Sequence, residues 1–424
     1  MIKHYFKLAA SMLRENKLTS IVSILGTALS VAMILVVVLQ FQIKLVGFPP
    51  ESNRSRMLYI YGIKVDKNDH TRQDNTSLSA GAVAECLYTL RLPEAVTAMT
   101  TGEQPLSLPN KRMYDEYSIR YTDASFWHVY DFGFLAGAPF TQADFRSALP
   151  RAVVALPLAR KLFGSAEAAI GKSFLLNYVE YTITGVVDKP SEAADGTVAD
   201  VWIPYSASSF MDDSNCEGIE GDFGAVVLAR SSHDFDAINR ELQHQVARYN
   251  AGKKDYRLTF IRLFSRLDVA RDAGNIYSSD KEGWNDYLLH KAPLLLFLLL
   301  VPALNLTGIV QSSIQRRRSE MGIRKAFGAT KGQLMVQLLN ENLLITLIGG
   351  VIGIVLSVVM LYLGRSFLLE KDVVLTFDML FKPWLFLAAL FFTLLLNLLS
   401  AGLPALRVSR EQIVDALHED ESDK

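Results

Sequence analysis

Four long apolar runs constrain the fold of this 424-residue chain more than any other feature. None of them contains an aspartate, a glutamate or an arginine, and their only lysine is Lys44, near the end of the first run. Each run is close to the ~20 residues that a helix needs to cross about 30 Å of hydrocarbon. Pro302 lies inside the second run, where a membrane helix tolerates proline because neighbouring groups satisfy the freed carbonyl. The sequence therefore predicts four membrane-spanning helices, which include the apolar residues 21–46, 293–310, 343–363 and 384–401.

Basic residues beside these runs predict the orientation of the chain, because lysine and arginine near span ends are retained on the cytoplasmic side. They gather in the N-terminal tail, after the second run and after the fourth run, at Lys3, Lys7, Arg14, Lys17, Arg316, Arg317, Arg318, Arg324, Lys325, Lys331, Arg407 and Arg410. Both termini are therefore expected in the cytoplasm. A cleaved signal peptide is the weaker alternative for the first run, because the apolar part of a signal peptide spans only about 7–15 residues.

The runs and the charges divide the chain into successive segments. In order these are an amphipathic helix on the cytoplasmic face (1–17), a first span (18–46), an external domain (47–290), a second span (291–312), a cytoplasmic loop (313–338), a third span (339–364), a short external loop (365–382), a fourth span (383–404) and a cytoplasmic tail (405–424). The first segment repeats Ile2, Phe6, Ala9 and Leu13 at helical spacing, as a helix lying on the inner leaflet would. An ordinary cytosolic extension of the first span is the alternative.

The external domain has the sequence pattern of a mixed α/β fold. Strands are predicted at 57–63, 181–187 and 225–228, which are rich in β-branched and aromatic residues, and helices at 80–90, 155–162 and 234–249. Strand-plus-helix units occur at the two ends of the domain, and the residues between them have a different sequence pattern. This arrangement indicates one subdomain, at about 47–110 and 225–280, with a second subdomain inserted at about 111–224. The expected fold class is a four-helix membrane protein with a large mixed α/β extracytoplasmic domain between its first two spans.

The sequence lacks the residues that several functional classes require. The net charge of -1 gives no reason to expect a nucleic-acid partner. The segment 170–173, Ile-Gly-Lys-Ser, is similar to the end of a phosphate-binding loop, but Ala166 stands where that motif needs glycine. The seven histidines form no metal-ligand spacing, and no G-x-S-x-G motif is present. We therefore predict no catalytic, cofactor-binding or metal-binding residue in the chain.

The two cysteines, Cys86 and Cys216, both fall in the external domain. An oxidising periplasm permits a disulfide between them. Buried free thiols are the default expectation, since the spacing alone says nothing of their geometry.

The predicted cytoplasmic loop carries a second kind of signal. After three arginines at 316–318 comes a short amphiphilic segment in which Gly328 is a plausible helix C-terminal stop. We expect this segment to form a docking helix, built from Glu320, Met321, Gly322, Ile323, Arg324, Lys325, Ala326, Phe327, Gly328, Ala329 and Thr330. The arginines by themselves are equally explained as an anchor that fixes orientation. In the third span Gly349 and Gly353 form a G-x-x-x-G pair, which is expected in helix packing and would suit a dimer contact, although such pairs also occur by chance.

The segment from Glu320 to Thr330, followed by residues 338–341, Leu-Leu-Asn-Glu, resembles the signature of the MacB/FtsX-type ABC transporter permeases, in particular the macrolide-exporter-like ones. Other parts of the chain are similar to the same family. They are residues 6–17, Phe126 with Trp127, Gly137, residues 159–164, 170–172, 185–188, 404–408 and 415–417. The fused exporters of this family carry their own ATPase domain, and this sequence shows none.

The resemblance implies a multi-pass protein of the inner membrane, with a periplasmic porter subdomain that holds the inserted one. It implies a dimer with a second permease copy or a paralogue, and an ABC ATPase subunit that binds ATP and Mg²⁺ and docks on the coupling helix Glu320–Thr330. A membrane-fusion protein, an outer-membrane channel and membrane lipid are further implied partners. Motion driven by the ATPase would act on a periplasmic substrate, such as a drug or a peptide, by mechanotransmission. The alternatives are an FtsX-like or bacitracin-resistance-like regulator of a cell-wall hydrolase or sensor kinase, and an ATPase-independent receptor.

Overall fold

The computed structural model describes most of the external domain and parts of three helices in the apolar runs. The described residues are 17–67, 73–108, 111–208, 219–260, 263–271, 289, 293, 327–328, 330–364 and 383–395. Contacts divide the chain into two units, one of residues 1–42, 284–370 and 375–424, and the other of residues 43–283 and 371–374. The amphipathic helix predicted at 1–17, apart from its last residue, lies outside the described residues. So do the cytoplasmic tail and, apart from Pro293, the second span.

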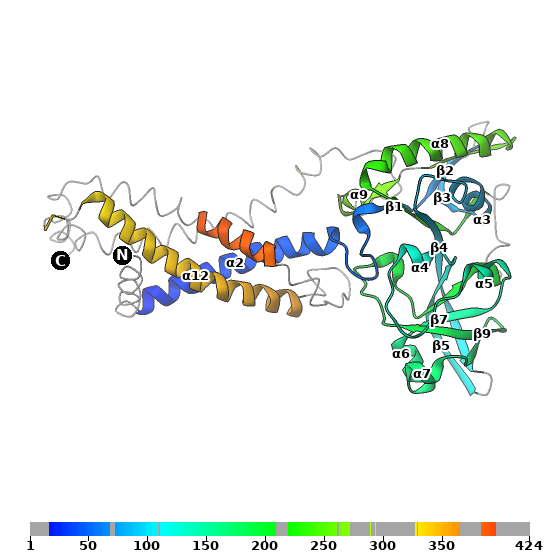
Figure 1. Ribbon diagram of the computed structural model, residues 1–424, viewed down its shortest axis with the longest axis horizontal. Helices are drawn as coiled ribbons and strands as arrows, with labels where there is room; N and C mark the ends of the chain where they lie inside the picture. The colour runs from blue at the N-terminus through cyan, green and yellow to red at the C-terminus, as the bar shows by residue number, and fades with distance from the viewer. Residues whose placement is uncertain are drawn as a thin grey trace. The chain divides into compact units, whose positions relative to one another are not determined.

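The first unit contains the apolar helix α2 (Lys17–Leu45) as far as Gln42, the apolar helix α12 (Lys331–Leu363) and a shorter helix at Pro383–Leu395 (Figure 1). By length and composition, α2 and α12 are able to cross a membrane over Ser20–Leu45 and Leu343–Leu363. These two helices correspond to the first and third predicted spans. The fourth predicted span is described only as far as residue 395, so the number four stays a prediction.

Small residues bring α2 and α12 close together. A Cβ atom added at Gly349 would lie 2.8 Å from the Cβ of Thr27, and one added at Gly353 would lie 2.7 Å from the carbonyl oxygen of Ala28. The hydroxyl of Thr27 is buried and donates to the Ser23 carbonyl at 2.8 Å, so it needs no partner from lipid. The helix that packs on both glycines in the structure is therefore a helix of the same chain.

Replacing Gly353 by leucine should separate α2 from α12, since the new side chain has no space beside Ala28 and Val31. Overpacking of this kind costs about 1–3 kcal/mol. We expect a lower apparent Tm for the full chain in detergent. The matched control is Gly332→Leu. Gly332 lies on the same helix, and a Cβ added there meets nothing within 4 Å. Equal Tm values for the two variants would contradict the close approach.

The second unit is built on a ten-stranded sheet in the order β14-β1-β12-β4-β5-β10-β7-β9-β6, with β8 paired to β4 and β9. Its strands are β1 (Met57–Ile60), β4 (Ala95–Leu108), β5 (Lys111–Thr122), β6 (Phe134–Gly137), β7 (Arg151–Ala155), β8 (Ser173–Leu176), β9 (Val179–Val187), β10 (Val201–Pro204), β12 (Gly224–Leu228) and β14 (Phe264–Ser265). Only the β10–β5 and β7–β9 pairs are parallel among these described strands. A smaller sheet has the order β11-β3-β2-β13, from β11 (Glu220–Gly221), β3 (Gln73–Leu78), β2 (Ile63–Lys67) and β13 (Tyr256–Phe260).

The helices of this unit are short, apart from α8 (Phe235–Ala251), which is marked in green in Figure 1. The others are α3 (Ala80–Ala82), which continues as the π-helix η2 (Val83–Leu87), α4 (Phe126–Val129), α5 (Gln142–Arg146), α6 (Leu156–Phe163), α7 (Ala166–Ala169) and α9 (Arg266–Arg271). Single 3₁₀ turns occur at η1 (Arg54–Arg56), η3 (Asp195–Thr197), η4 (Tyr205–Ala207) and η6 (Ser232–Asp234).

The large sheet has a different core on each face, because successive strand residues point to opposite sides. On β1, Leu58 and Ile60 join a core that includes Ile238 of α8. Met57 and Tyr59 join the other core, which is rich in aromatic side chains, namely Phe126, Tyr130, Phe140, Trp202 and Phe264. The aromatic core is the one that borders the candidate site below.

The predicted strands are confirmed as β1, β9 and β12, and the predicted helices as α6 and α8. The helix predicted at 80–90 is present as α3 with the π-helix after it. The mixed α/β character of this domain is thus confirmed. Its division into an outer and an inserted subdomain stays a prediction. Cys86 is a buried free thiol whose pKa burial raises to about 12, whereas Cys216 lies outside the described residues.

Candidate functional site

Three of the predicted coupling residues lie in the described part of the chain. The Phe327 side chain is 89% exposed, and Gly328 has a φ of +93°, which favours glycine. Thr330 caps α12, because its hydroxyl accepts a hydrogen bond from the backbone N–H of Gln333 at 3.4 Å. Residues 320–326 and Ala329 lie outside the described residues, so the coupling helix stays a prediction.

The C-terminal end of α2 forms a second site, which was not among the residues predicted from the sequence. The Arg54 guanidinium is fully buried and pairs with the Glu51 carboxylate at 2.6 Å. Its Nη1 donates to the carbonyl oxygens of Ile43 at 2.8 Å and Val46 at 3.2 Å, and its Nη2 donates to that of Ala193. Carbonyls in the last turn of a helix lack helical partners and carry the negative end of the helix dipole, so a buried arginine suits this position.

A second arginine, more than 200 residues further along the sequence, also binds the C-terminal end of α2. Arg266, the first residue of α9, donates from Nε to the Lys44 carbonyl at 2.7 Å. Its guanidinium lies 5.8 Å from the ring centroid of Tyr59 on β1. Arg54 precedes β1, and Arg266 follows β14, the strand paired to β1. We call Glu51, Arg54 and Arg266 the α2 clamp, since they tie the end of α2 to the edge of the large sheet.

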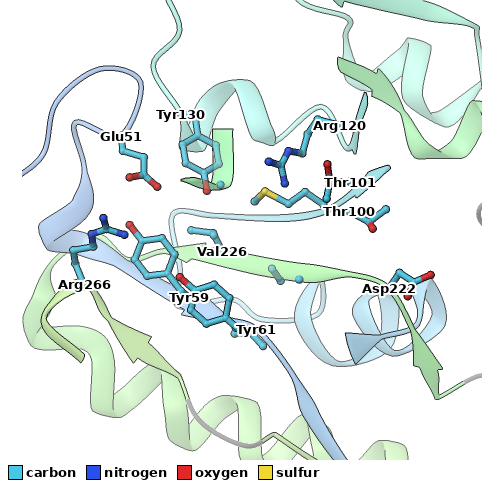
Figure 2. A pocket seen from close by; sticks show the side chains of 15 residues that line it. Glu51, Tyr59, Tyr61, Thr100, Thr101, Arg120, Tyr130, Asp222, Val226 and Arg266 are labelled. Carbon is cyan, nitrogen blue, oxygen red and sulfur yellow. The ribbon is translucent and has the colours of Figure 1, made fainter. Parts of the chain in front are cut away.

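A cavity of about 600 Å³ adjoins the α2 clamp on the aromatic side of the sheet. We call it the tyrosine pocket, and its main lining residues are Glu51, Tyr59, Tyr61, Arg120, Tyr130 and Arg266 (Figure 2). The rings of Tyr59 and Tyr61 are stacked, with centroids 6.2 Å apart and planes 6° apart. Thr100 and Thr101 of β4 and Val226 of β12 supply further lining. A pocket of this size suits a small organic ligand.

The pocket presents hydroxyl donors and cations. Figure 2 shows the Tyr130 hydroxyl directed into the space between Glu51, Tyr59 and Arg120. Burial and the nearby Glu51 carboxylate raise the pKa values of Tyr59 and Tyr130, so both hydroxyls keep their protons. Arg120 donates from Nη2 to the Val198 carbonyl at 2.9 Å. The arrangement is able to bind and orient a polar group.

A buried carboxylate, that of Asp123, lies at the start of the segment that carries Tyr130. Asp123 follows β5 and accepts hydrogen bonds from the Thr97 hydroxyl at 2.8 Å, from the backbone N–H groups of Ala98 and Phe126 at 3.0 Å each, and from the Tyr88 hydroxyl. Burial raises the pKa of Asp123, against the effect of these donors. Because Phe126 begins α4, Asp123 fixes the start of the helix that leads to Tyr130.

One signal for the α2 clamp was available in the sequence. Glu51 and Arg54 stand three residues apart directly after the first apolar run, where a buried ion pair at a helix end is plausible. Nothing local marks Tyr59, Arg120, Tyr130 or Arg266, because they meet only through the pairing of distant strands.

Two family models match the chain. The model described as MacB-like periplasmic core domain matches residues 20–245, and the one described as FtsX-like permease C-terminal matches residues 294–413. The first match includes the first apolar run and most of the external domain, and the second includes the region of the later apolar runs.

Curated relatives agree with these matches. The chain is 24% identical over 358 residues to the uncharacterized ABC transporter permease YknZ of Bacillus subtilis, which covers 82% of this chain and 83% of YknZ. It is 27% identical over 297 residues to the macrolide export ATP-binding/permease protein MacB of Burkholderia cenocepacia, covering 70% of this chain and 40% of MacB. It is 25% identical over 251 residues to the pyoverdine export ATP-binding/permease protein PvdT of Pseudomonas savastanoi, covering 59% of this chain. The chain spans 35% of the length of that relative.

Among solved structures, the periplasmic region of MacB from Actinobacillus actinomycetemcomitans matches 51% of this chain and 93% of its own length. The sequence identity is 15% and the TM-score is 0.35.

Proposed function

We propose a function from one premise, which is that this chain belongs to the MacB/FtsX-type family of ABC transporter permeases, with a MacB-like periplasmic core domain and an FtsX-like C-terminal region. Members of this family lie in the inner membrane with a periplasmic domain, and they work with an ABC ATPase. In our proposal the chain is a transport subunit with four spans and cytoplasmic termini. A separate ATPase subunit binds ATP and Mg²⁺ and drives motion of the periplasmic domain.

The observation that carries this proposal is the continuity of α2 and the way it ends. The helix runs without a break from Lys17 to Leu45, and Arg54 and Arg266 bind carbonyls at its end. Both arginines flank strands at one edge of the large sheet. Force applied to this end of α2 would therefore reach the sheet through direct hydrogen bonds, as mechanotransmission requires.

The cytoplasmic end of the mechanism rests on the loop before α12. We assign the coupling helix to Glu320–Thr330, supported by the exposed Phe327 side chain and by the family match of residues 294–413. A cytoplasmic ATPase would dock there and move the permease between two states, for which it needs different contacts in each state.

Export of a periplasmic substrate is the transport role that we propose. Two relatives are named for export of macrolides and of pyoverdine, and this chain shares 27% and 25% identity with them. A second permease copy or paralogue, a membrane-fusion protein and an outer-membrane channel would complete the assembly. Regulation of a cell-wall hydrolase or a sensor kinase by the same motion is the alternative.

The test is the substitution Phe327→Asp in the full chain, coexpressed with its candidate ATPase. Loss of an aromatic anchor from a docking surface costs about 2 kcal/mol or more, which corresponds to at least tenfold weaker association. We expect co-purification of the ATPase and permease-stimulated ATP hydrolysis to fall together, as they should for Glu320→Lys.

The control for this test is Gly332→Asp, which adds the same charge five residues away without removing an aromatic side chain. Gly332 is exposed and is the second residue of α12, in the first helical turn, where an acidic residue is favourable. Unchanged co-purification and hydrolysis in Phe327→Asp would refute the assignment of the coupling helix.

A further inference from the structure

Two groups at the tyrosine pocket, the buried Tyr130 and the partly buried Arg266, have polar atoms without a hydrogen-bond partner among the described residues. The Tyr130 side chain is fully buried, and its hydroxyl has no hydrogen-bond partner among the residues described for this unit. Arg266 uses Nε for the Lys44 carbonyl, and its Nη groups bond to no other residue in the described parts of the chain. An unpaired buried hydroxyl costs about 1–3 kcal/mol, so a bound ligand that accepts its hydrogen bond would recover that energy.

The charges around the pocket favour a negatively charged ligand. Arg120 and Arg266 line it, and Arg54 neutralises Glu51 at 2.6 Å. The remaining acidic group, Asp222, is exposed. Guanidinium groups bind carboxylates through two parallel hydrogen bonds, and tyrosine hydroxyls that keep their protons are donors to the same oxygens.

The apolar lining defines the rest of the ligand. The stacked rings of Tyr59 and Tyr61 form a flat surface, and Met99 and Val226 extend it. A planar apolar body fits such a surface by offset or edge contacts. Gly196 keeps the space beside Tyr130 open, since a Cβ there would lie 2.8 Å from the Tyr130 hydroxyl oxygen.

We propose that the tyrosine pocket binds a free organic anion with a planar apolar body, and that Arg266 transmits its occupancy to the end of α2. The anionic group is held by the Nη atoms of Arg266, by Arg120 and by the Tyr130 hydroxyl. Arg266 donates from Nε to the Lys44 carbonyl on α2 at 2.7 Å, so a shift of its guanidinium toward a ligand changes the hold on the helix. Ligand binding is independent of the proposed function, and only the transmission through Arg266 rests on it.

The binding half is tested with 2-naphthoate and the full chain in nanodiscs of phosphatidylcholine, by equilibrium dialysis. We expect saturable binding of 2-naphthoate and at least about tenfold weaker binding of the neutral 2-naphthamide and the cationic 2-naphthylmethylamine. Tyr130→Phe should weaken 2-naphthoate binding about tenfold while the Tm is kept, because the lost hydroxyl has no hydrogen-bond partner among the described residues. Tyr249→Phe is the control, since Tyr249 belongs to the core on the other face of the sheet.

Three results would overturn the binding half. They are no saturable binding of 2-naphthoate, equal affinity for the three naphthyl compounds, and wild-type affinity in Tyr130→Phe. Displacement of 2-naphthoate by phosphatidylglycerol added to the nanodisc would assign the site to membrane lipid and overturn a free anion as its ligand. Arg266→Met is a second variant, with weaker binding expected, in case Tyr130→Phe fails to fold.

The transmission half is tested with Arg266→Lys in complex with the ATPase. Lysine keeps the positive charge, but one ammonium group is unable to hold the Lys44 carbonyl and the anion in the fixed geometry of a guanidinium. We expect 2-naphthoate to change ATP hydrolysis in the wild type and to have no effect in Arg266→Lys, each measured at a 2-naphthoate concentration that saturates that protein. The same response in both proteins would refute transmission through Arg266. An ATPase whose hydrolysis rate is the same with and without the permease would refute the proposed function instead. The binding result would be unaffected.

Discussion

Arg54→Met should lower the stability of the periplasmic domain more than any other single substitution in the α2 clamp. The variant leaves the Glu51 carboxylate buried without its cation and removes the donors to the Ile43, Val46 and Ala193 carbonyls. Breaking a buried ion pair by removing one partner costs about 3–5 kcal/mol. For a domain of this size we expect the apparent Tm of the full chain to fall by about 10 °C or more. Proteolysis near residues 46–54 should become faster.

Arg56→Met is the matched control, since Arg56 lies on the same 3₁₀ turn and also pairs with a carboxylate. Its bond to Glu94, at 2.7 Å, lies at the surface, with both side chains about a third exposed. Exposed ion pairs contribute little to stability. The double variant Glu51→Gln, Arg54→Met should recover part of the lost Tm, because no buried charge is then left unpaired. Equal Tm values for Arg54→Met and Arg56→Met would rule out the clamp as an important contact.

Asp123→Ala has the second largest expected effect. It removes the acceptor of four hydrogen bonds, from Thr97, Ala98, Phe126 and Tyr88, at a fully buried position. Each buried donor that loses its partner costs about 1–3 kcal/mol, and relaxation recovers only part of the sum, so we expect a loss of about 3–5 kcal/mol. Thermal unfolding of the full chain, followed by tryptophan fluorescence, measures it.

Asp115→Ala provides the comparison for Asp123→Ala. Asp115 lies on β5, the strand that Asp123 follows, and bonds to Lys161 at 2.6 Å, but both side chains are about half exposed. We expect no measurable change in Tm for this control. Since Asp123 fixes the start of α4, Asp123→Ala should also weaken ligand binding at the tyrosine pocket. A Tm equal to that of Asp115→Ala would show that the buried hydrogen bonds are replaced by water.

Local sequence patterns predicted the elements of the fold, because apolar length and side-chain alternation are properties of short segments. The apolar runs at 21–46 and 343–363 correspond to α2 and α12, and the β-branched runs to β1, β9 and β12. The sequence also pointed to Gly349 and Gly353 as packing residues, but a G-x-x-x-G spacing does not say which helix approaches. In the structure that helix is α2 of the same chain.

The candidate site depends on long-range pairing, which no local pattern contains. Tyr59 of β1 lies opposite Val226 of β12, and β12 pairs with β4, the strand that carries Thr100. Arg120 lies on β5, the next strand of the sheet after β4, opposite Thr101. A shift of one residue in any of these registers would turn the lining side chains to the other face. The coupling helix, by contrast, was predicted from sequence and resemblance and stays a prediction.

The unbroken order of the large sheet, from β14 beside the α2 clamp to β6 at the far edge, limits how the domain can respond to a push. Ten hydrogen-bonded strands resist bending between neighbours, and β4 and β5 share a ladder along nearly their whole length. A displacement applied to the edge strand β14 would therefore move the sheet as one unit. A displacement of β14 would then also move β6, although the two strands lie at opposite edges of the sheet.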